Sequence, residues 1–215
     1  MSQPLSGKHA LITGGGTGIG AATAKWLAAQ GAQVTLVGRR MEPLREVASG
    51  IGKQAFATTA DVTDASALET AFGASRERFG RHDILVNNAG IARGGPFLRQ
   101  TDEDWSAIFA TNLFSIVTTT KLALPGMLEA GWGRVVNVAS IAGLRGSPYT
   151  TAYTASKHAL VGMTRSLALE VWKKGVTVNA VCPGYVDTPM TDQTVANIQK
   201  TTGRSEAEAR AEIEK

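Results

Sequence analysis

A run of glycines between an apolar segment and a helical segment most narrows what this chain can fold into. Lys8–Thr13 is short and apolar, which indicates a β-strand, and five of the seven residues in Gly14–Gly20 directly after it are glycine. Ala21–Gln30 then has a helical composition and stops before Gly31. Glycines allow a tight turn and close packing of a helix on a strand. This order therefore predicts the first strand–loop–helix unit of an α/β sheet.

The alternation of short apolar runs with longer helical segments continues along the chain. The further predicted strands are Gln33–Val37, Gln54–Thr59, Asp83–Val86, Arg134–Ala139 and Val176–Val181. The further predicted helices are Glu42–Ser49, Ala65–Phe79, Asp104–Leu128 and Tyr149–Lys174. Strands that are apolar on both faces are typical of a parallel sheet covered by helices. With right-handed crossovers, the order predicts an α/β fold of the Rossmann type, a doubly wound parallel sheet with helices on both faces.

Length and composition exclude several classes of protein. The 215 residues suit one domain, and 43% apolar with 19% charged residues is typical of a globular protein. The net charge of +4 comes from dispersed basic residues, which argues against a nucleic-acid partner. No apolar run reaches the ~18 residues of a membrane span, so we expect no membrane partner. The single cysteine, Cys182, fits a reducing cytoplasm and is expected to be buried packing.

The glycine loop also predicts a ligand. It reads Thr13-Gly14-Gly15-Gly16-Thr17-Gly18-Ile19-Gly20. The N-terminus of the following helix offers unpaired backbone N–H groups and a partial positive charge to a pyrophosphate. No lysine follows Gly20, which excludes a P-loop. The alternative is a plain strand-to-helix turn, but so many glycines after a strand favour a dinucleotide site.

The end of the second predicted strand indicates which dinucleotide is preferred. The strand ends Val37-Gly38-Arg39-Arg40 and carries no acidic residue, which would bind a ribose 2′-OH. An arginine there accommodates a 2′-phosphate. We therefore predict NADP(H) as the preferred cofactor and NAD(H) as possible, with Arg39 the first contact and Arg40 the second. The alternative is that both are solvated surface arginines.

Several further motifs occur in a fixed order. They are Thr13-Gly14-x-x-x-Gly18-x-Gly20, Asp61-Val62, Asn87-Asn88-Ala89-Gly90, Asn112, Ser140, Tyr153-x-x-x-Lys157 and Pro183-Gly184. In these motifs, from Lys8 to about Met190, the chain resembles the short-chain dehydrogenase/reductase family, in its small single-domain group. Within the family it looks like the 3-oxoacyl thioester reductases. The resemblance implies hydride transfer between a nicotinamide dinucleotide and a carbonyl or secondary alcohol.

The motifs and the resemblance together assign the cofactor site. The expected cofactor-binding residues are Gly14, Thr17, Gly18, Ile19, Gly20, Arg39, Arg40, Asp61, Val62, Asn88, Ala89, Gly90, Tyr153, Lys157, Pro183, Gly184, Val186 and Thr188. By resemblance, Asp61 and Val62 should lie beside the adenine, and Thr188 should reach the nicotinamide carboxamide. The Asn87–Gly90 run should support both the sheet and the cofactor.

The expected catalytic residues are Ser140, Tyr153, Lys157 and Asn112. Tyr153 and Lys157 are four residues apart, which places them on one face of a helix. A neighbouring ammonium should lower the pKa of the phenol and fit it for general acid–base catalysis. Ser140 should hydrogen-bond the substrate oxygen, and by resemblance Asn112 should hold a water in a proton relay through Lys157. Singly, each residue has a structural alternative as a surface, capping or packing group; together they favour catalysis.

Other residues are expected to be structural. The chain has three histidines, His9, His82 and His158, without metal-ligand spacing, so we predict no metal site. The tryptophans at 105, 132 and 172 are expected to be packing anchors. The charged stretch 205–215 predicts an amphipathic helix with Ser205 as its N-cap.

By resemblance, family members continue into a seventh strand and a final helix. We therefore expect residues 1–215 to be a single dinucleotide-binding and catalytic domain that lacks those two elements in the sequence shown. The resemblance also implies a homotetramer or homodimer built through the helices at 104–128 and 149–174. The substrate should be a small carbonyl or alcohol, and a β-keto thioester is one candidate. A non-catalytic dinucleotide sensor or scaffold is the alternative, and a sugar-nucleotide epimerase would need a larger C-terminal domain.

Overall fold

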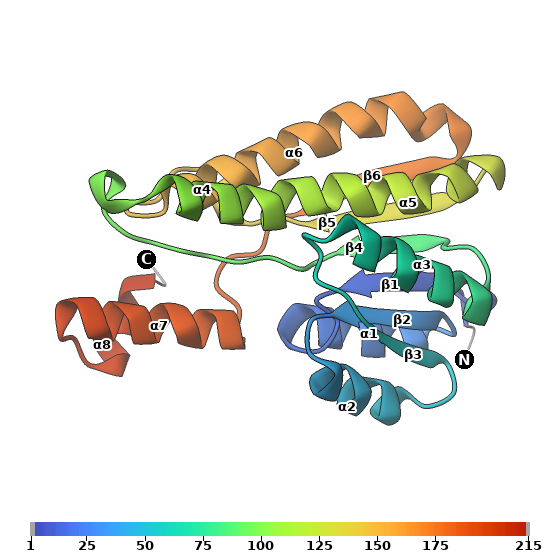
Figure 1. The fold of residues 1–215 in the computed structure, drawn as a ribbon, viewed down its shortest axis with the longest axis horizontal. Coiled ribbons are helices and arrows are strands. Elements are labelled where there is room, and N and C mark those ends of the chain that lie inside the picture. Colours follow the sequence, from blue (N-terminus) through green and yellow to red (C-terminus); the bar gives the residue numbers. More distant parts are fainter. Residues whose placement is uncertain (1–2, 214–215) are drawn as a thin grey trace.

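The computed structural model describes residues 3–213, and its centre is a sheet of six parallel strands. The strands are β1 (His9–Thr13), β2 (Gln33–Gly38), β3 (Ala55–Thr59), β4 (Ile84–Asn87), β5 (Gly133–Val138) and β6 (Val176–Val181). Their order is β3-β2-β1-β4-β5-β6, so the chain winds outward from β1 in both directions (Figure 1). This confirms the predicted doubly wound Rossmann-type fold. Each predicted strand is found with its ends displaced by at most one residue.

Helices cover both faces of the sheet. They are α1 (Gly18–Ala29), α2 (Met41–Ile51), α3 (Ala65–Phe79), α4 (Asp102–Phe109), α5 (Ser115–Glu129), α6 (Thr151–Val171), α7 (Pro189–Thr202) and α8 (Glu206–Ile213). Strand residues alternate between two cores, as the period of a β-strand requires. Ala10 and Ile12 of β1 pack with α1 and α2, whereas Leu11 packs with α3, α5 and α6. Burial on both faces explains why the strand sequences are apolar throughout.

The helices differ from the prediction in three main respects. Helix α1 begins at Gly18, three residues before its predicted start, because Thr17 has extended backbone (φ −149°) and is the N-cap. The predicted helix 104–128 is instead α4 and α5 joined by a π-helical segment, Ala110–Phe114. Helix α7 was not predicted, because Val195 is the only residue of α7 that is buried.

Two expectations about individual side chains had different outcomes. Ser205 is the predicted N-cap of α8, since its Oγ accepts a hydrogen bond from the Glu208 amide at 3.3 Å; residues 214 and 215 lie outside the described residues. The expectation that Trp172 is a packing anchor was wrong, because its side chain is 59% exposed. Trp172 is the C-cap of α6 and begins the short 3-10 turn that follows it.

The stretch Asp102–Glu129 is long and apolar enough, by length and composition, to cross a membrane. The stretch is interrupted by polar residues, and one helix of this kind is weak evidence, because core helices of soluble proteins pass the same test. Its α5 part packs against α3, β4 and β5, and its α4 part packs against α6. The stretch is therefore part of the helix layer on one face of the sheet.

Helices α7 and α8 lie beyond the carboxyl ends of the strands, apart from the main helix layers (Figure 1). They are held to each other by Arg210, whose guanidinium donates to Asp192 at 2.9 Å and to Glu206 at 3.0 Å. The segment from β6 to α7 crosses the edge of the sheet where ligands bind in open α/β folds. The two helices therefore border the candidate site.

Candidate active site

The glycine loop connects β1 to α1 with an open helix N-terminus. Gly14 (φ 65°) and Gly18 (φ 51°) have left-handed backbone, which glycine adopts without strain. The N-cap, Thr17, makes no side-chain hydrogen bond, and the first turn of α1 has no acidic residue. By contrast, Asp64 caps α3 through the Ala67 amide. The uncapped N–H groups of α1 therefore fit a pyrophosphate.

Close packing of the loop explains the remaining glycine of the motif. A Cβ on Gly20 would collide with the Gly14 carbonyl oxygen and lie 2.5 Å from Asn88 Nδ2. Asn88 Nδ2 donates to the carbonyl oxygens of Thr13 (3.0 Å) and Gly14 (3.1 Å). Ile19 follows Gly18 in the first turn of α1. The loop is thus fastened to the end of β4.

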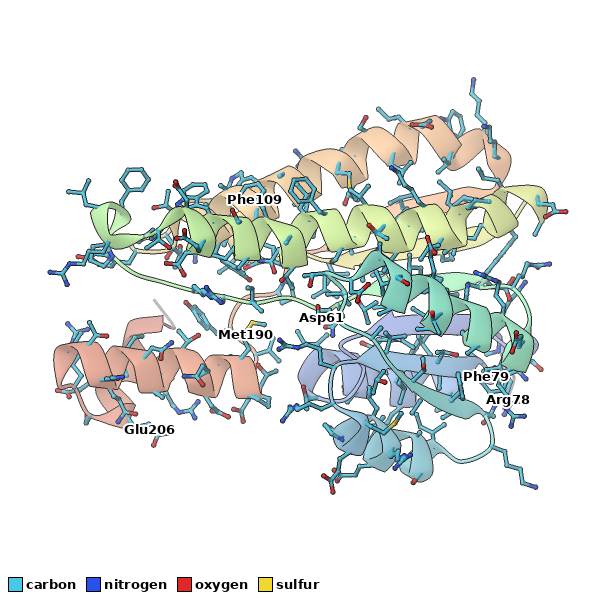
Figure 2. The ribbon with its side chains drawn as sticks, in the orientation of Figure 1. Asp61, Arg78, Phe79, Phe109, Met190 and Glu206 are labelled. Atoms are coloured by element: carbon cyan, nitrogen blue, oxygen red, sulfur yellow. The ribbon has the colours of Figure 1, made fainter. Side chains whose placement is uncertain are left out.

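The residues expected to choose between NADP(H) and NAD(H) meet at the ends of β2 and β3. Arg39 and Arg40 are exposed, and Arg40 is the N-cap of α2. Hydrogen bonds from the backbone and hydroxyl of Thr63 lower the pKa of Asp61, and the positive charge of Arg39 adds to this effect. Figure 2 shows Asp61 at the same end of the sheet as Met190 at the start of α7. Val62 is buried in the core instead of lining the surface.

The end of β4 joins the glycine loop to the residues that are expected to be catalytic. The Thr13 hydroxyl accepts hydrogen bonds from the amides of Asn88 (3.0 Å) and Ala89 (3.1 Å). A Cβ on Gly90 would lie 3.3 Å from Asn112 Oδ1 and 3.8 Å from Lys157 Nζ. Before this segment, the Asn87 side chain donates to Asn137 Oδ1 of β5 at 2.9 Å. Asn87 therefore braces the sheet, as expected from the motif.

Asn112 lies in the π-helical segment, a distortion that often marks functional sites. Its Oδ1 accepts from the Ile91 amide at 2.9 Å, and its Nδ2 donates to the Ile91 carbonyl at 2.9 Å. Nδ2 also donates to Ser156 Oγ at 3.2 Å. Both polar atoms of the buried side chain are thus bonded to protein atoms, which holds the segment after Gly90 against α6. The predicted water relay stays a prediction.

Ser140, Tyr153 and Lys157 converge at the carboxyl ends of β5 and β6. Ser140 follows β5, and its Oγ accepts from the Ala142 amide at 3.1 Å and lies within hydrogen-bonding reach of the Tyr153 phenol. Tyr153 is in the first turn of α6, with Lys157 one turn later. Lys157 Nζ lies 5.7 Å from the Tyr153 ring centroid and donates to the Val138 carbonyl at 2.9 Å. The prediction that residues 153 and 157 lie on one face of a helix agrees with this geometry.

The electrostatics of this group differ from the prediction in one respect. Burial raises the pKa of Tyr153, a hydrogen bond with Ser140 opposes this, and the nearby Tyr185 adds to the increase. Burial also lowers the pKa of Lys157 to about 8, with Cys182 acting in the opposite direction. The expectation that the ammonium lowers the pKa of the phenol was therefore wrong for the chain by itself. The reason is that burial outweighs the charge of an ammonium that is itself desolvated.

The segment after β6 brings the last group of expected cofactor residues to the site. The Pro183 carbonyl accepts from the Ile141 amide at 2.9 Å, which places this segment beside Ser140, and Gly184 and Val186 follow it as exposed residues. Thr188 is the N-cap of α7, and a Cβ on Gly18 would lie 3.0 Å from its Cγ2. Thr188 is therefore held next to the glycine loop.

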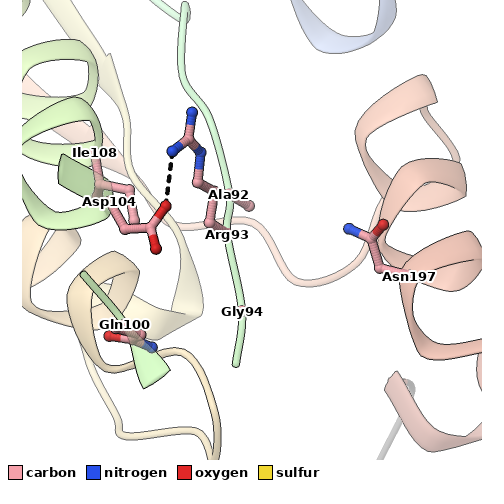
Figure 3. A pocket seen from close by; sticks show the side chains of 7 residues that line it. All are labelled: Ala92, Arg93, Gly94, Gln100, Asp104, Ile108 and Asn197. Atoms are coloured by element: carbon pink, nitrogen blue, oxygen red, sulfur yellow. Dashed lines mark hydrogen bonds and ion pairs between the residues drawn. The ribbon is translucent and has the colours of Figure 1, made fainter. Parts of the chain in front are cut away.

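A cavity of about 250 Å³ lies next to this group, between the 91–100 segment and α7. Its lining residues are Ala92, Arg93, Gly94, Gln100, Asp104, Ile108 and Asn197 (Figure 3). Arg93 donates to Asp104 at 2.8 Å, so its guanidinium is held at the wall by an acidic partner. The Gly95 amide donates to the Tyr149 carbonyl at 2.7 Å, which ties this segment to the start of α6.

Two residues of the site were missed by the sequence analysis. Tyr185 lies near Tyr153, and Ser156 links Asn112 to α6. The position of Tyr185 directly after Pro183-Gly184 was an available signal, whereas nothing in the local pattern distinguishes Ser156. The expectation that Cys182 is buried was wrong, because it is partly exposed, and it lies near Lys157. Within residues 3–213, no group of His, Cys, Asp and Glu could hold a metal ion.

Known proteins are similar to this chain along most of its length. The family model for short chain dehydrogenases matches residues 8–199. D-beta-hydroxybutyrate dehydrogenase of Cupriavidus necator is 42% identical over 212 residues, covering 97% of this chain and 82% of that protein. The structure of an actinorhodin polyketide ketoreductase variant with NADPH has a TM-score of 0.91 and 40% identity, covering 97% of this chain and 82% of that one.

A second solved structure holds the other cofactor. The 3-ketoacyl-(acyl-carrier-protein) reductase from Brucella melitensis, complexed with NADH, has a TM-score of 0.84 and 34% identity. It covers 86% of this chain and 79% of its own. Both solved neighbours contain a nicotinamide dinucleotide, and the glycine loop fits one here. These findings favour an enzyme over a non-catalytic sensor or scaffold. The chain belongs to the short-chain dehydrogenase/reductase family and is a nicotinamide-dependent oxidoreductase that acts on carbonyl or alcohol groups.

Proposed function

We propose that this chain reduces the 3-oxo group of an acyl thioester with NADPH, and that Tyr153 is the proton donor. The observation that carries this proposal is the Tyr153 phenol, whose pKa burial raises, beside the Ser140 hydroxyl. A phenol that stays protonated at neutral pH is suited to protonate the oxygen of a carbonyl as it becomes an alkoxide.

The other residues position and stabilise the reacting oxygen. Ser140 Oγ accepts from the Ala142 amide, which orients its O–H toward the Tyr153 phenol, and the substrate oxygen would take the place of the phenol as the acceptor of that proton. Lys157 Nζ donates to the Val138 carbonyl and lies 5.7 Å from the Tyr153 ring centroid, where its charge acts against the effect of burial as the phenolic proton leaves. Asn112 fixes the segment beside Gly90. When bound, the cofactor supplies the hydride.

The preference for NADP(H) rests on the end of β2. Arg39 and Arg40 are exposed there, and Asp61 is the acidic group near Arg39. Asp61 already accepts from the Thr63 amide at 2.9 Å and its hydroxyl at 2.8 Å, which leaves the arginines to meet a 2′-phosphate. NAD(H) remains the second cofactor in this proposal.

The substrate class is supported by the names of the relatives. A β-hydroxybutyrate dehydrogenase, a polyketide ketoreductase and a 3-ketoacyl reductase are all similar to this chain. Each name indicates a substrate with a keto or hydroxyl group. The names of the hydroxybutyrate dehydrogenase and the 3-ketoacyl reductase place that group on the third carbon of the acyl chain. In this chain, the cavity between residues 92–94 and Asn197 gives such an acyl arm a path beside the site.

We include the remaining expectations in the proposal. Residues 1–215 form one dinucleotide-binding and catalytic domain in the cytoplasm, with no nucleic-acid or membrane partner. Two copies associate through α4–α5 and α6 as a homodimer or as half of a homotetramer. Exposed apolar side chains support this association: Phe114, at the end of the π-helical segment between α4 and α5, is 60% exposed, and Leu169 of α6 is 77% exposed.

The experiment is a comparison of substrates at neutral pH. Acetoacetyl-coenzyme A with NADPH and with NADH is compared with 3-hydroxybutyrate and NAD⁺, using the absorbance of the reduced nicotinamide. The proposal predicts thioester reduction, faster with NADPH. Oxidation of 3-hydroxybutyrate without thioester reduction would overturn the substrate class, and equal rates with NADH would overturn the cofactor preference.

A further inference from the structure

Ser156 lies between the two catalytic residues of α6 and is completely buried. Its Oγ donates to the Tyr153 carbonyl oxygen at 2.7 Å. The same Oγ accepts from Asn112 Nδ2 at 3.2 Å. The hydroxyl therefore uses both its donor and an acceptor position, and it reaches no solvent or cavity.

The partners of Ser156 connect the acid–base group to the cofactor side of the site. Tyr153 provides both the phenol and the carbonyl that Ser156 holds. Asn112 is bonded through its other contacts to the amide and carbonyl of Ile91, directly after Gly90. One hydroxyl thus joins the first turn of α6 to the segment that follows β4. No other side-chain hydrogen bond among the described residues joins Asn112 to α6.

We propose that Ser156 is a positioning residue for the reaction, which sets the distance between the Tyr153 phenol and the cofactor segment at Gly90 through Asn112. This inference rests on the proposed role of Tyr153 as proton donor. Without the hydroxyl, Asn112 keeps its contacts with Ile91 but loses its connection to α6. The helix turn that carries Tyr153 can then shift relative to Gly90, and small displacements of reacting groups slow a reaction strongly.

The same helix provides a matched control. Thr164 is also buried, its Oγ1 donates to the Leu160 carbonyl at 2.7 Å, and it accepts from Asn137 Nδ2 at 2.9 Å. Thr164 therefore has the same kind of contacts as Ser156, two turns further along α6 and away from Tyr153. Ser156→Ala and Thr164→Val each remove one buried hydroxyl and little volume.

The kinetic test compares the two variants with the parent chain. We expect Ser156→Ala to lower kcat about tenfold, a loss typical of slightly misplaced groups, while the KM for NADPH changes less than about twofold. Ser156→Thr keeps the hydroxyl and should recover part of kcat. Thr164→Val should lower thermal stability as much as Ser156→Ala but leave kcat within about twofold of the parent. Equal kcat values for Ser156→Ala and Thr164→Val would overturn the proposal.

A second readout needs no turnover and separates this inference from the proposed reaction. The Ile91 amide donates to Asn112 Oδ1 but does not touch Ser156, so its hydrogen exchange reports on the connection. Exchange at Ile91, measured by NMR, should be faster in Ser156→Ala and unchanged in Thr164→Val. Unchanged exchange in both variants would overturn the connection. If the parent chain reduces no 3-oxoacyl thioester, the proposed function fails, and exchange at Ile91 alone decides the role of Ser156.

Discussion

The rings of His9 and His82 pack with their centroids 4.8 Å apart, inside the core at the end of the sheet opposite the candidate site. Ser75 bonds to both, with its Oγ 2.9 Å from His82 Nε2 and 3.3 Å from His9 Nε2. Burial, with smaller contributions from His9 and Arg76, lowers the pKa of His82 to about 3. Burial also lowers the pKa of His9, against the opposing charge of Asp83. Both histidines therefore stay neutral in the folded chain at pH values where the unfolded chain is protonated.

This pair predicts a loss of stability in mild acid. The unfolded chain binds protons below about pH 6.5 at both histidines, and folded His82 does not, so the free energy of unfolding falls as pH falls, by up to about 1.4 kcal/mol per pH unit for His82, and the lowered pKa of His9 adds to this fall. Denaturant unfolding between about pH 6.5 and 5 measures this slope above the range in which carboxyl groups titrate. His82→Gln keeps a polar partner for Ser75 and should make the slope clearly smaller. An unchanged slope would contradict the account.

Substitution of Gly20 by alanine should damage the glycine loop, because the added Cβ would meet Gly14 and Asn88. We expect the free energy of unfolding to fall by about 1 to 3 kcal/mol and NADPH affinity to fall with it. Gly73 on α3 is the control, since a Cβ there would meet nothing within 4 Å. Gly73→Ala should stabilise the chain by about 0.5 to 1 kcal/mol. Similar effects of the two substitutions in urea unfolding would show that the contacts of Gly20 are unimportant.

Arg39→Asp should weaken NADPH binding about 10- to 100-fold, because a charged hydrogen bond to the 2′-phosphate would be replaced by repulsion. NADH lacks that phosphate, and its affinity should change by less than about threefold. Arg78→Asp makes the same charge change at the opposite end of the sheet (Figure 2) and controls for the overall field. Fluorescence titration measures the affinity of each variant for NADPH and for NADH. Equal losses for NADPH and NADH in Arg39→Asp would rule out the 2′-phosphate contact.

Phe114→Asp should dissociate the proposed oligomer, because it puts a charge into the α4–α5 surface that we expect to be buried between two copies. Trp26 on α1 is a matched control, since it is an aromatic residue that is also 60% exposed, on the other helix layer. Trp26→Asp should leave the mass unchanged in light scattering at micromolar concentration. A monomeric parent chain, or equal effects of the two substitutions, would refute the association surface.

The strands could be predicted from the sequence because what determines them is local in the chain. Strands buried on both faces need apolar runs, and glycine or charged residues mark their ends, as at Thr13 and Gly14. Helix α7 was missed because little of it is buried, although Thr188 and Pro189 formed an N-cap and N1 signal. The π-helical segment was missed because no local pattern distinguishes it from an α-helix, and the contact of its Asn112 with Ile91 joins segments that are distant in the sequence.

The candidate site was predicted through motifs, and the structure adds what spacing does not contain. The spacing of Tyr153 and Lys157 predicts that they share a helix face, but the direction of the pKa change depends on how deeply each group is buried. Similarly, the role of Asn112 in holding Ile91 follows from the fold of distant segments. Ser156 had no sequence signal, since a serine within a helix is common.

The most direct test of the account is the rate of 3-oxoacyl thioester reduction by Tyr153→Phe, followed through the absorbance of NADPH. The substitution removes the phenolic oxygen and little else, so NADPH affinity should stay within about twofold of the parent. The account predicts that turnover falls by at least about 100-fold, the usual contribution of a positioned general acid. Turnover close to that of the parent chain, with NADPH still bound, would contradict Tyr153 as the proton donor.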